Sequence, residues 1–332
     1  LPVMKVGGFS EARVDEIDVA DLIAGAGYAD QIRATGDRVK IRGTSHPGLP
    51  RTLPVDRDLA VFLGYYLVAG SNNQSGRRYT VTLSFEVGRS GLAADAAARI
   101  HTVFGYEPKI IESAAGIEVT IRSKLIYLLV NALGCGSHAD ERSVPDLLFN
   151  IDRALIGDYL GTAFRAGKKK ISRRQARSIR LKMTSRDAAR RLVWLAGEIG
   201  VQMTYTERDM RVRWSGDMQK VYVCSITAQD QINRFCAETG YNAGSTIGRL
   251  ADGAFTHLPR GGGGFERTAI ACAGRYQAGG LDGIQVSLFL PPAAGQIACG
   301  DVHPLRIRSI EPVTSDGYVY DLVDVAGTHT FA

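Results

Sequence analysis

The chain has 332 residues, of which 45% are hydrophobic, enough for two domains or one repeated domain with appendages, each with its own core. This composition excludes a chain that is mostly disordered, and no run approaches the ~18 apolar residues of a membrane span. The 40 basic and 34 acidic residues give a net charge of only +6, but the charge is unevenly placed. Five cysteines form no Cys-x-x-Cys pair and have no histidine at metal-ligand spacing, which is typical of an intracellular protein.

Residues 1–45 form an N-terminal segment that begins with LPVMKVGG. This opening lacks the form of a signal peptide, and it lacks an initiating methionine, so we expect a fragment of something longer. The predicted location is the cytoplasm of a cell of archaeal or bacterial type.

Two nine-residue segments of the chain are alike, FLGYYLVAG at 62–70 and YLGTAFRAG at 159–167, and they begin 97 positions apart. Each follows a helix-start signal, at Pro54 and at Pro145, and each ends in Ala-Gly. A polar, strand-like segment comes after each of them. The pattern therefore predicts one structural unit that occurs twice, with halves at residues 46–135 and 136–240.

The two halves share a predicted order of elements, αββαββα. In the first half, the motif helix precedes predicted strands and helices at 78–87, 92–104, 108–112, 116–122 and 124–134. In the second half, a helix from Pro145 to Gly167 precedes a basic hairpin at 172–183, a helix at 185–200, strands at 201–206, 210–214 and 221–226, and a helix at 230–240. These patterns predict an α+β fold.

The repeat resembles the LAGLIDADG homing endonucleases, whose two motif helices pack side by side at a pseudo-twofold axis. Gly64 and Gly161 match the inner glycine that lets the two helix backbones approach closely, and Gly70 and Gly167 match the terminal glycine. The resemblance implies a tandem αββαββα fold whose two saddle-shaped sheets lie in the major groove of double-stranded DNA. It also implies a long, partly asymmetric target site and a monomer, because the internal repeat already supplies the symmetry.

Ala69 and Ala166 stand where the family carries the acids that hold Mg²⁺. The resemblance implies that an active parent cleaves both strands of an intein-less allele by Mg²⁺-dependent hydrolysis, and that this chain binds DNA without cutting it. The Mg²⁺ site is expected to be weak or absent here. Natural loss and deliberate substitution both explain the alanines, and the well-kept motif helices favour substitution.

Lysines near the second motif are the candidates for a catalytic role in the active parent, where they would position water or stabilise the leaving oxygen. Lys182 comes first, followed by Lys169. In the first half only Glu86 and Arg89 occupy the corresponding strand, and they match less well. A simple phosphate contact is the alternative role for each lysine.

A basic run from Arg165 to Arg191 contains twelve basic residues and one acid, Asp187. Apolar and basic residues alternate over 178–184, which predicts a strand with one face toward the core and one toward a polyanion. The alternative is a solvated helix face with a charged hairpin. We predict phosphate contacts from the following residues: Arg77, Arg78, Lys168, Lys170, Arg173, Arg174, Arg177, Arg180 and Arg186.

Residues 241–300 fit neither half, and we interpret them as an insertion or linker. Their glycine run at 261–264 lacks the strand before it and the helix after it that a phosphate-binding loop requires.

Residues 301–332 predict two strands joined by a turn, with the sequences VYDL and THTF near the end. This segment resembles the penultimate splicing block of an intein, and His329 falls on the histidine of that block. The segment 1–45 likewise resembles a remnant of the splicing domain. Splicing by this polypeptide is not expected, because Leu1 is no nucleophile and Ala332 is no terminal Asn or Gln.

Two other functions remain open from the sequence. A nucleic-acid-binding regulator or RNA maturase on the same scaffold would prefer structured RNA, whereas an endonuclease module would bind a duplex of ~20 base pairs in a salt-sensitive manner. A purely structural remnant of an intein would show no sequence preference for DNA.

Overall fold

The computed structural model describes residues 2–4, 13–44, 48–167, 178–211, 217–241 and 302–304. The chain divides into two compact units, one made of residues 1–7 and 251–332 and the other of residues 8–250. In the first unit, β1 (Pro2–Met4) pairs antiparallel with β14 (Val302–Pro304). The glycine run at 261–264 and His329 lie outside the described residues, and the boundaries predicted at residues 45, 135, 240 and 300 stay predictions.

The unit of residues 8–250 begins with a small segment that packs on the first half. It consists of β2 (Glu16–Asp18), α1 (Val19–Ile23), η1 (Ala24–Tyr28), η2 (Ala29–Gln31), β3 (Ile32–Thr35), β4 (Arg38–Ile41), β5 (Leu49–Pro50) and β6 (Thr52–Pro54). The Asp18 carboxylate caps α1 by accepting the N–H groups of Ala20 and Asp21, as expected of an N-terminal cap. Val19 and Ile23 are fully buried, and α1 contacts α4 of the first half.

The first half, from α2 to α4, has the predicted αββαββα order. Its elements are α2 (Arg57–Ala69), β7 (Gly70–Ser75), β8 (Arg78–Phe85), α3 (Ser90–Phe104), β9 (Lys109–Ser113), β10 (Gly116–Ile121) and α4 (Lys124–Ala132). The four strands form one antiparallel sheet in the order β7-β8-β10-β9.

The second half, from η3 to α7, repeats this arrangement. Its elements are η3 (Asp146–Phe149), α5 (Arg153–Ala166), β11 (Ile179–Met183), α6 (Arg186–Glu198), β12 (Thr204–Arg211), β13 (Met218–Ile226) and α7 (Gln229–Thr239). The strands pair in the order β11-β13-β12, so β11, β13 and β12 take the places of β8, β10 and β9. The first part of the predicted basic hairpin, residues 168–177, lies outside the described residues.

Two predicted boundaries in the second half were wrong. The motif helix does not begin near Pro145, because Asp152 caps it by accepting the Ala154 N–H, and the residues before this cap form only the short turn η3. The strands predicted at 201–206 and 210–214 are largely one strand, β12, because Thr204 to Arg211 pair without a break with β13.

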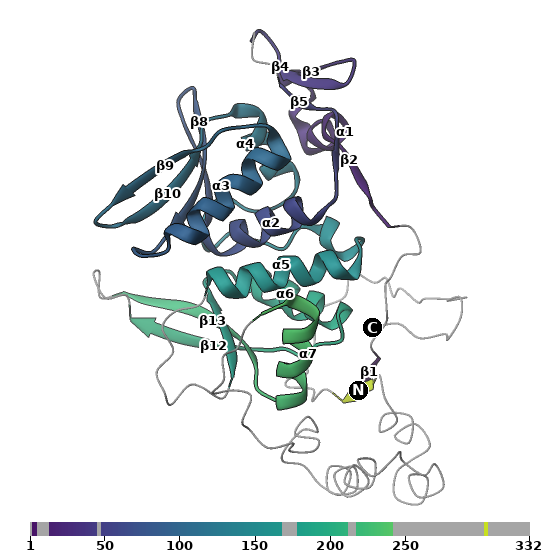
Figure 1. The fold of residues 1–332 in the computed structure, drawn as a ribbon, viewed down its shortest axis with the longest axis vertical. Helices are drawn as coiled ribbons and strands as arrows, with labels where there is room; N and C mark the ends of the chain where they lie inside the picture. Colours follow the sequence, from purple (N-terminus) through teal and green to yellow (C-terminus); the bar gives the residue numbers. More distant parts are fainter. Residues whose placement is uncertain are drawn as a thin grey trace, which may run out of the picture. The chain divides into compact units, whose positions relative to one another are not determined.

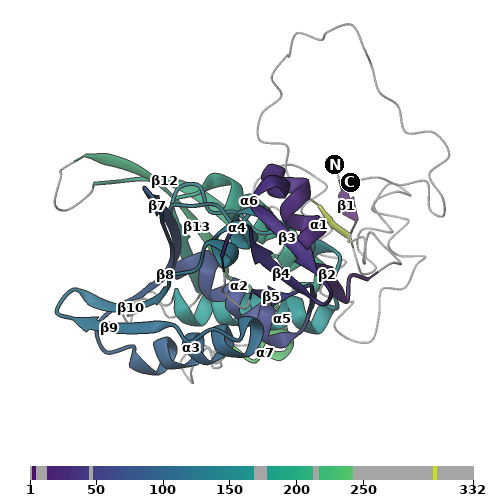
Figure 2. The same cartoon turned by 90° about the horizontal axis from the view of Figure 1, so that it is seen from above.

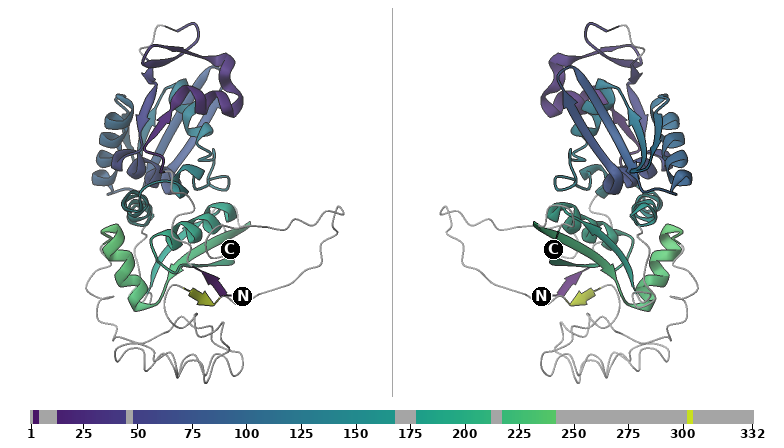
Figure 3. Two further views of the ribbon diagram at one scale, coloured as in Figure 1. Left: turned by 90° about the vertical axis from the view of Figure 1, so that its right-hand side faces the viewer. Right: turned by 90° about the vertical axis from the view of Figure 1, so that its left-hand side faces the viewer.

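The architecture is the predicted α+β fold with two similar halves. Figure 1 shows α2 and α5 side by side between the two halves, and the contacts between these helices are extensive. Figure 3 shows the strands and helices of both halves in two further views. In Figures 1 and 2 the hairpins β9–β10 and β12–β13 extend from the same side of this unit. No helix among the described residues is both long and apolar enough to cross a membrane.

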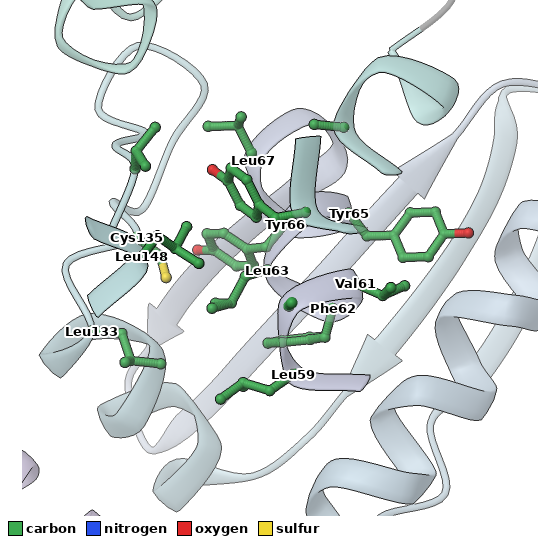
Figure 4. Close-up of a cluster of buried hydrophobic side chains, with 14 of the residues drawn as sticks. Leu59, Val61, Phe62, Leu63, Tyr65, Tyr66, Leu67, Leu133, Cys135 and Leu148 are labelled. Carbon is green, nitrogen blue, oxygen red and sulfur yellow. The ribbon is translucent and has the colours of Figure 1, made fainter. Parts of the chain in front are cut away.

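Helix α2 is buried on nearly all sides, as an apolar helix inside a core should be. Figure 4 shows its side chains together with Leu133, Cys135 and Leu148, which close the cluster from the segment after α4. The two tyrosine hydroxyls of α2 have partners, since Tyr66 donates to the Gly136 carbonyl at 2.7 Å and Tyr65 donates to Asp95 at 2.7 Å. Packing therefore fixes the position at which α2 ends.

The inner glycines of the two motifs, Gly64 and Gly161, pack against different helices. A Cβ added at Gly64 would lie 2.6 Å from the Tyr159 carbonyl oxygen, closer than real Cβ atoms come, so Gly64 permits the close approach of α2 and α5. At Gly161, which was predicted to serve the same contact, the atoms nearest to an added Cβ belong to Thr239 at the end of α7. This part of the prediction is corrected, because α7 packs on that side of α5.

Candidate nucleic-acid interface

A cavity of about 310 Å³ lies where the two motif helices end. Ala69, the last residue of α2, and Ala166, the last residue of α5, both line it. The structure thus brings together the two positions at which the sequence predicted missing acids. Its polar lining comes from both halves and from the segment between them: Ser84, Glu86, Arg89, Arg142, Lys182 and Thr184.

Arg142 holds the carbonyl end of α2. Its Nε donates to the Gly70 oxygen at 2.8 Å, and its Nη1 donates to the oxygens of Val68 at 2.8 Å and Leu67 at 3.4 Å. A cation at this end of a helix is stabilised by the helix dipole. Burial lowers the pKa of Arg142, although a guanidinium remains charged at neutral pH. Sequence reasoning missed this residue, which lies in the segment joining the halves.

Arg89 holds the carbonyl end of α5 in a similar way. Its Nη1 donates to the oxygens of Ala166 at 2.8 Å and Arg165 at 3.3 Å. The carboxylate of Glu86 lies 3.8 Å from Arg89 Nε. Because Arg89 belongs to the turn after β8, a first-half residue fixes the end of the second-half motif helix.

The donors around this cavity do not fit a magnesium ion. Mg²⁺ prefers an octahedron of hard oxygen ligands with one or two carboxylates, and Ala69 and Ala166 supply no side-chain oxygen. Glu86 is the one carboxylate in the described lining, and three cations, Arg89, Arg142 and Lys182, line the same cavity. Nowhere in the described parts of the chain do three His, Cys, Asp or Glu residues gather as a metal site would require.

The sheet of the first half has a polar outward face. Val81 and Leu83 of β8 are buried, so Thr80, Thr82 and Ser84 alternate to the other side. The register with the neighbouring strands places further polar side chains on the same face, namely Ser71, Asn73, Lys109 and Glu118. The predicted phosphate contacts Arg77 and Arg78 are exposed at the turn between β7 and β8.

The sheet of the second half is more basic. Ile179 and Leu181 of β11 are buried while Arg180 and Lys182 are exposed, which is the alternation that the sequence predicted. The register with β12 and β13 places Thr206 and Arg208 on the same face as these two cations. Arg186 is exposed in the first turn of α6. Of these cations, Lys182 also lines the cavity at the helix ends.

Six residues of the predicted site lie outside the described residues, so their roles stay predictions. They are Lys168, Lys169, Lys170, Arg173, Arg174 and Arg177. The predicted phosphate contacts that the structure places are Arg77, Arg78, Arg180 and Arg186.

Among curated proteins, the chain is 25% identical over 276 residues to a DNA polymerase of Thermococcus aggregans, covering 81% of this chain and 14% of that protein. It is 30% identical over 129 residues to the DNA polymerase II large subunit of Thermococcus kodakarensis, covering 39% of this chain and 6% of that protein. The chain thus spans only a small part of each of these relatives. No protein-family description matches the chain.

Among solved structures, a mesophilic variant of the homing endonuclease I-DmoI is similar with a TM-score of 0.41 and 14% identity, over 57% of this chain and 98% of that one. The full-length protein WhiA from Thermatoga maritima, whose N-terminal domain is a LAGLIDADG domain, gives a TM-score of 0.39 and 12% identity, over 74% and 80%. A point variant of I-DmoI, also similar to the chain, has been solved with its target DNA in the presence of magnesium. These likenesses are distant, at 14% and 12% sequence identity.

Proposed function

We propose that residues 8–250 bind double-stranded DNA with the outward faces of their two sheets. The observation that carries this proposal is the pair of similar sheets, each with an apolar face toward the core and an outer face whose edge strands carry exposed polar or basic side chains. Their hairpins extend from the same side of the unit (Figures 1 and 2). The major groove admits a two-stranded ribbon, and exposed arginine, asparagine and threonine side chains are groups that hydrogen-bond to base edges and phosphates.

The proposed target is a long, partly asymmetric duplex site, bound by a monomer. Two halves in one chain supply two binding surfaces, and these surfaces differ in residues, since Asn73 and Thr80 lie on the first face and Arg180 and Arg208 on the second. Unlike surfaces require unlike half-sites. A-form RNA is less suited, because its major groove is too deep and narrow for side chains to read.

We further propose that the chain binds this DNA without cutting it. The positions that would hold a metal beside the scissile phosphates are Ala69 and Ala166, and the surrounding donors do not fit Mg²⁺. A plasmid carrying the bound site should therefore stay supercoiled with Mg²⁺ or Mn²⁺. Linear product would refute this part of the proposal.

An intein origin is supported by two independent observations. The unit of residues 1–7 and 251–332 is split in sequence around the unit of residues 8–250, and β1 and β14 pair across that split. The similarity to the Thermococcus aggregans polymerase is confined to 14% of its length, which an element inserted into a host protein would produce. The proposed target is then an uninterrupted gene of a replication protein.

Selection from a pool of randomised duplexes tests the binding proposal. The chain is incubated with the pool at moderate salt, and the retained duplexes are sequenced. Recovery of one long, partly asymmetric motif is the expected result. Retention without enrichment, or a preference for structured RNA offered in competition, would contradict it and would favour a generic basic surface or an RNA-binding function.

A further inference from the structure

At the end of each motif helix, next to the alanine that replaces the expected acid, an arginine donates hydrogen bonds to the backbone carbonyls. Arg142 donates to the carbonyls of residues 67, 68 and 70, on both sides of Ala69. Arg89 donates to the carbonyls of residues 165 and 166. The two guanidinium groups therefore lie beside the helix ends at which a metal-binding carboxylate was expected.

The charge of the cavity is reversed relative to a metal site. Arg89, Arg142 and Lys182 contribute three positive charges and Glu86 one negative charge. Each helix end supplies about half an elementary negative charge. The two ends together therefore neutralise only part of the positive charge of Arg89 and Arg142. A cavity that remains cationic repels a divalent metal and attracts an anion.

We propose that this cavity is a metal-independent site for a DNA phosphodiester, held by Arg89, Arg142 and Lys182. The inference rests on the proposed DNA binding and deepens it by naming the contact at the centre of the two halves. Lys182 connects the cavity with the exposed face of β11, so a duplex that lies on the two sheets brings its backbone toward the same groups. The two guanidinium groups already donate to the helix-end carbonyls, so their contribution is positive charge, whereas Lys182 offers an ammonium group whose three donors suit a phosphate.

The surroundings of Ala69 and Ala166 determine what a carboxylate restored at either position would do. If they were only the result of removing two acids, restoring a carboxylate at position 69 would rebuild a metal site. In this structure the new carboxylate would instead lie beside Arg142 and form an ion pair with it. Restoration would then remove positive charge without creating metal affinity.

The first experiment compares Ala69→Glu with the uncharged variant of the same size, Ala69→Gln, in duplex binding with EDTA and with Mg²⁺. We expect the wild-type chain to bind equally well in both conditions. Ala69→Glu should bind roughly tenfold more weakly than Ala69→Gln in both conditions, because the added charge repels the phosphate. Ala166→Glu and Ala166→Gln form a second pair at the less buried position, should the first pair fail to fold.

A second experiment removes one of the three proposed phosphate-binding cations, Arg89, which also holds the carbonyl end of α5. Arg89→Gln should weaken duplex binding about tenfold and reduce the salt slope by about one. Arg33→Gln is the matched control, since Arg33 is exposed on β3 in the small N-terminal segment. The control should bind like the wild-type chain.

The outcomes separate this inference from the proposed function. If the wild-type chain binds no duplex, both the proposed DNA binding and the phosphodiester site are refuted. If it binds and Ala69→Glu gains affinity with Mg²⁺, or if Arg89→Gln behaves like Arg33→Gln, the metal-independent site is refuted while DNA binding by the sheets stands.

Discussion

The two halves share one order of elements but differ in what they expose and in how their motif helices are held. The outward face of the first sheet is mostly neutral, with Asn73, Thr80 and Thr82, whereas the second presents Arg180, Lys182 and Arg208. Helix α2 packs on α3, while α5 packs on α7. A duplicated unit can thus keep its fold while each copy acquires its own neighbours and surface chemistry.

The helix ends show a second asymmetry. Both arginines that hold them come from outside the second half's own elements, Arg89 from the turn after β8 and Arg142 from the segment before η3. The pseudo-twofold symmetry of the backbone is therefore not a symmetry of the cavity. We therefore expect substitutions at equivalent positions of the two halves to have unequal effects on stability and on DNA binding.

Gly64→Leu should be the most destabilising change. The new side chain meets the Tyr159 carbonyl and Thr162 where α2 and α5 touch, so the free energy of unfolding should fall by about 3 kcal/mol. Denaturant melts measure this loss. The control is Gly197→Ala in α6, where an added Cβ meets nothing within 4 Å, and it should gain about 0.5 kcal/mol.

Gly161→Ala should cost less, about 2 kcal/mol, and should act mainly on the second half, because its Cβ collides with Thr239 of α7. Cysteine labelling with mass-spectrometric mapping separates the halves. Burial raises the pKa of Cys135 and of Cys224 to about 12, so both thiols should stay unreactive near neutral pH until the protein opens. Labelling of Cys224 should accelerate and that of Cys135 should not. Equal acceleration of both would show that the halves open as one.

Arg180→Ala combined with Lys182→Ala should weaken binding to all duplexes and reduce the salt slope by about two. The contrasting change is Asn73→Ala on the first sheet, which should leave the salt slope unchanged and relax base preference at one position by about 1 kcal/mol. Fluorescence anisotropy over a salt series measures both. A salt slope that changes equally in the two variants would contradict the difference between the faces.

Asp95→Asn should have the smallest effect, a loss of about 1 kcal/mol confined to the first half. Asp95 accepts from the Tyr65 hydroxyl and from Arg99, which also pairs with Asp58, so these groups connect α2 to α3. Hydrogen exchange should show faster opening of α3 and an unchanged α6. Faster exchange in both helices would contradict a tie confined to one half.

The elements were predictable because their signals are local. Apolar periodicity and glycine position predict α2 and β8 from a few neighbouring residues each. The start of α5 was not predicted, because Pro145 suits a helix start but Asp152 supplies the actual cap. The contact of Gly161 with Thr239 and the reach of Arg142 to the end of α2 depend on how distant segments pack, which no short pattern contains.

A hydroxyl-radical footprint on the selected duplex, recorded in EDTA, is the most direct test of the claim that the two sheets of one chain share one DNA site. The account predicts two protected blocks that flank a central phosphate, with the central protection lost in Arg89→Gln. It also predicts that ethylation of phosphates interferes more in the block bound by the second sheet, because that sheet supplies more cations. A single protected block, or a footprint that appears only with Mg²⁺, would contradict it.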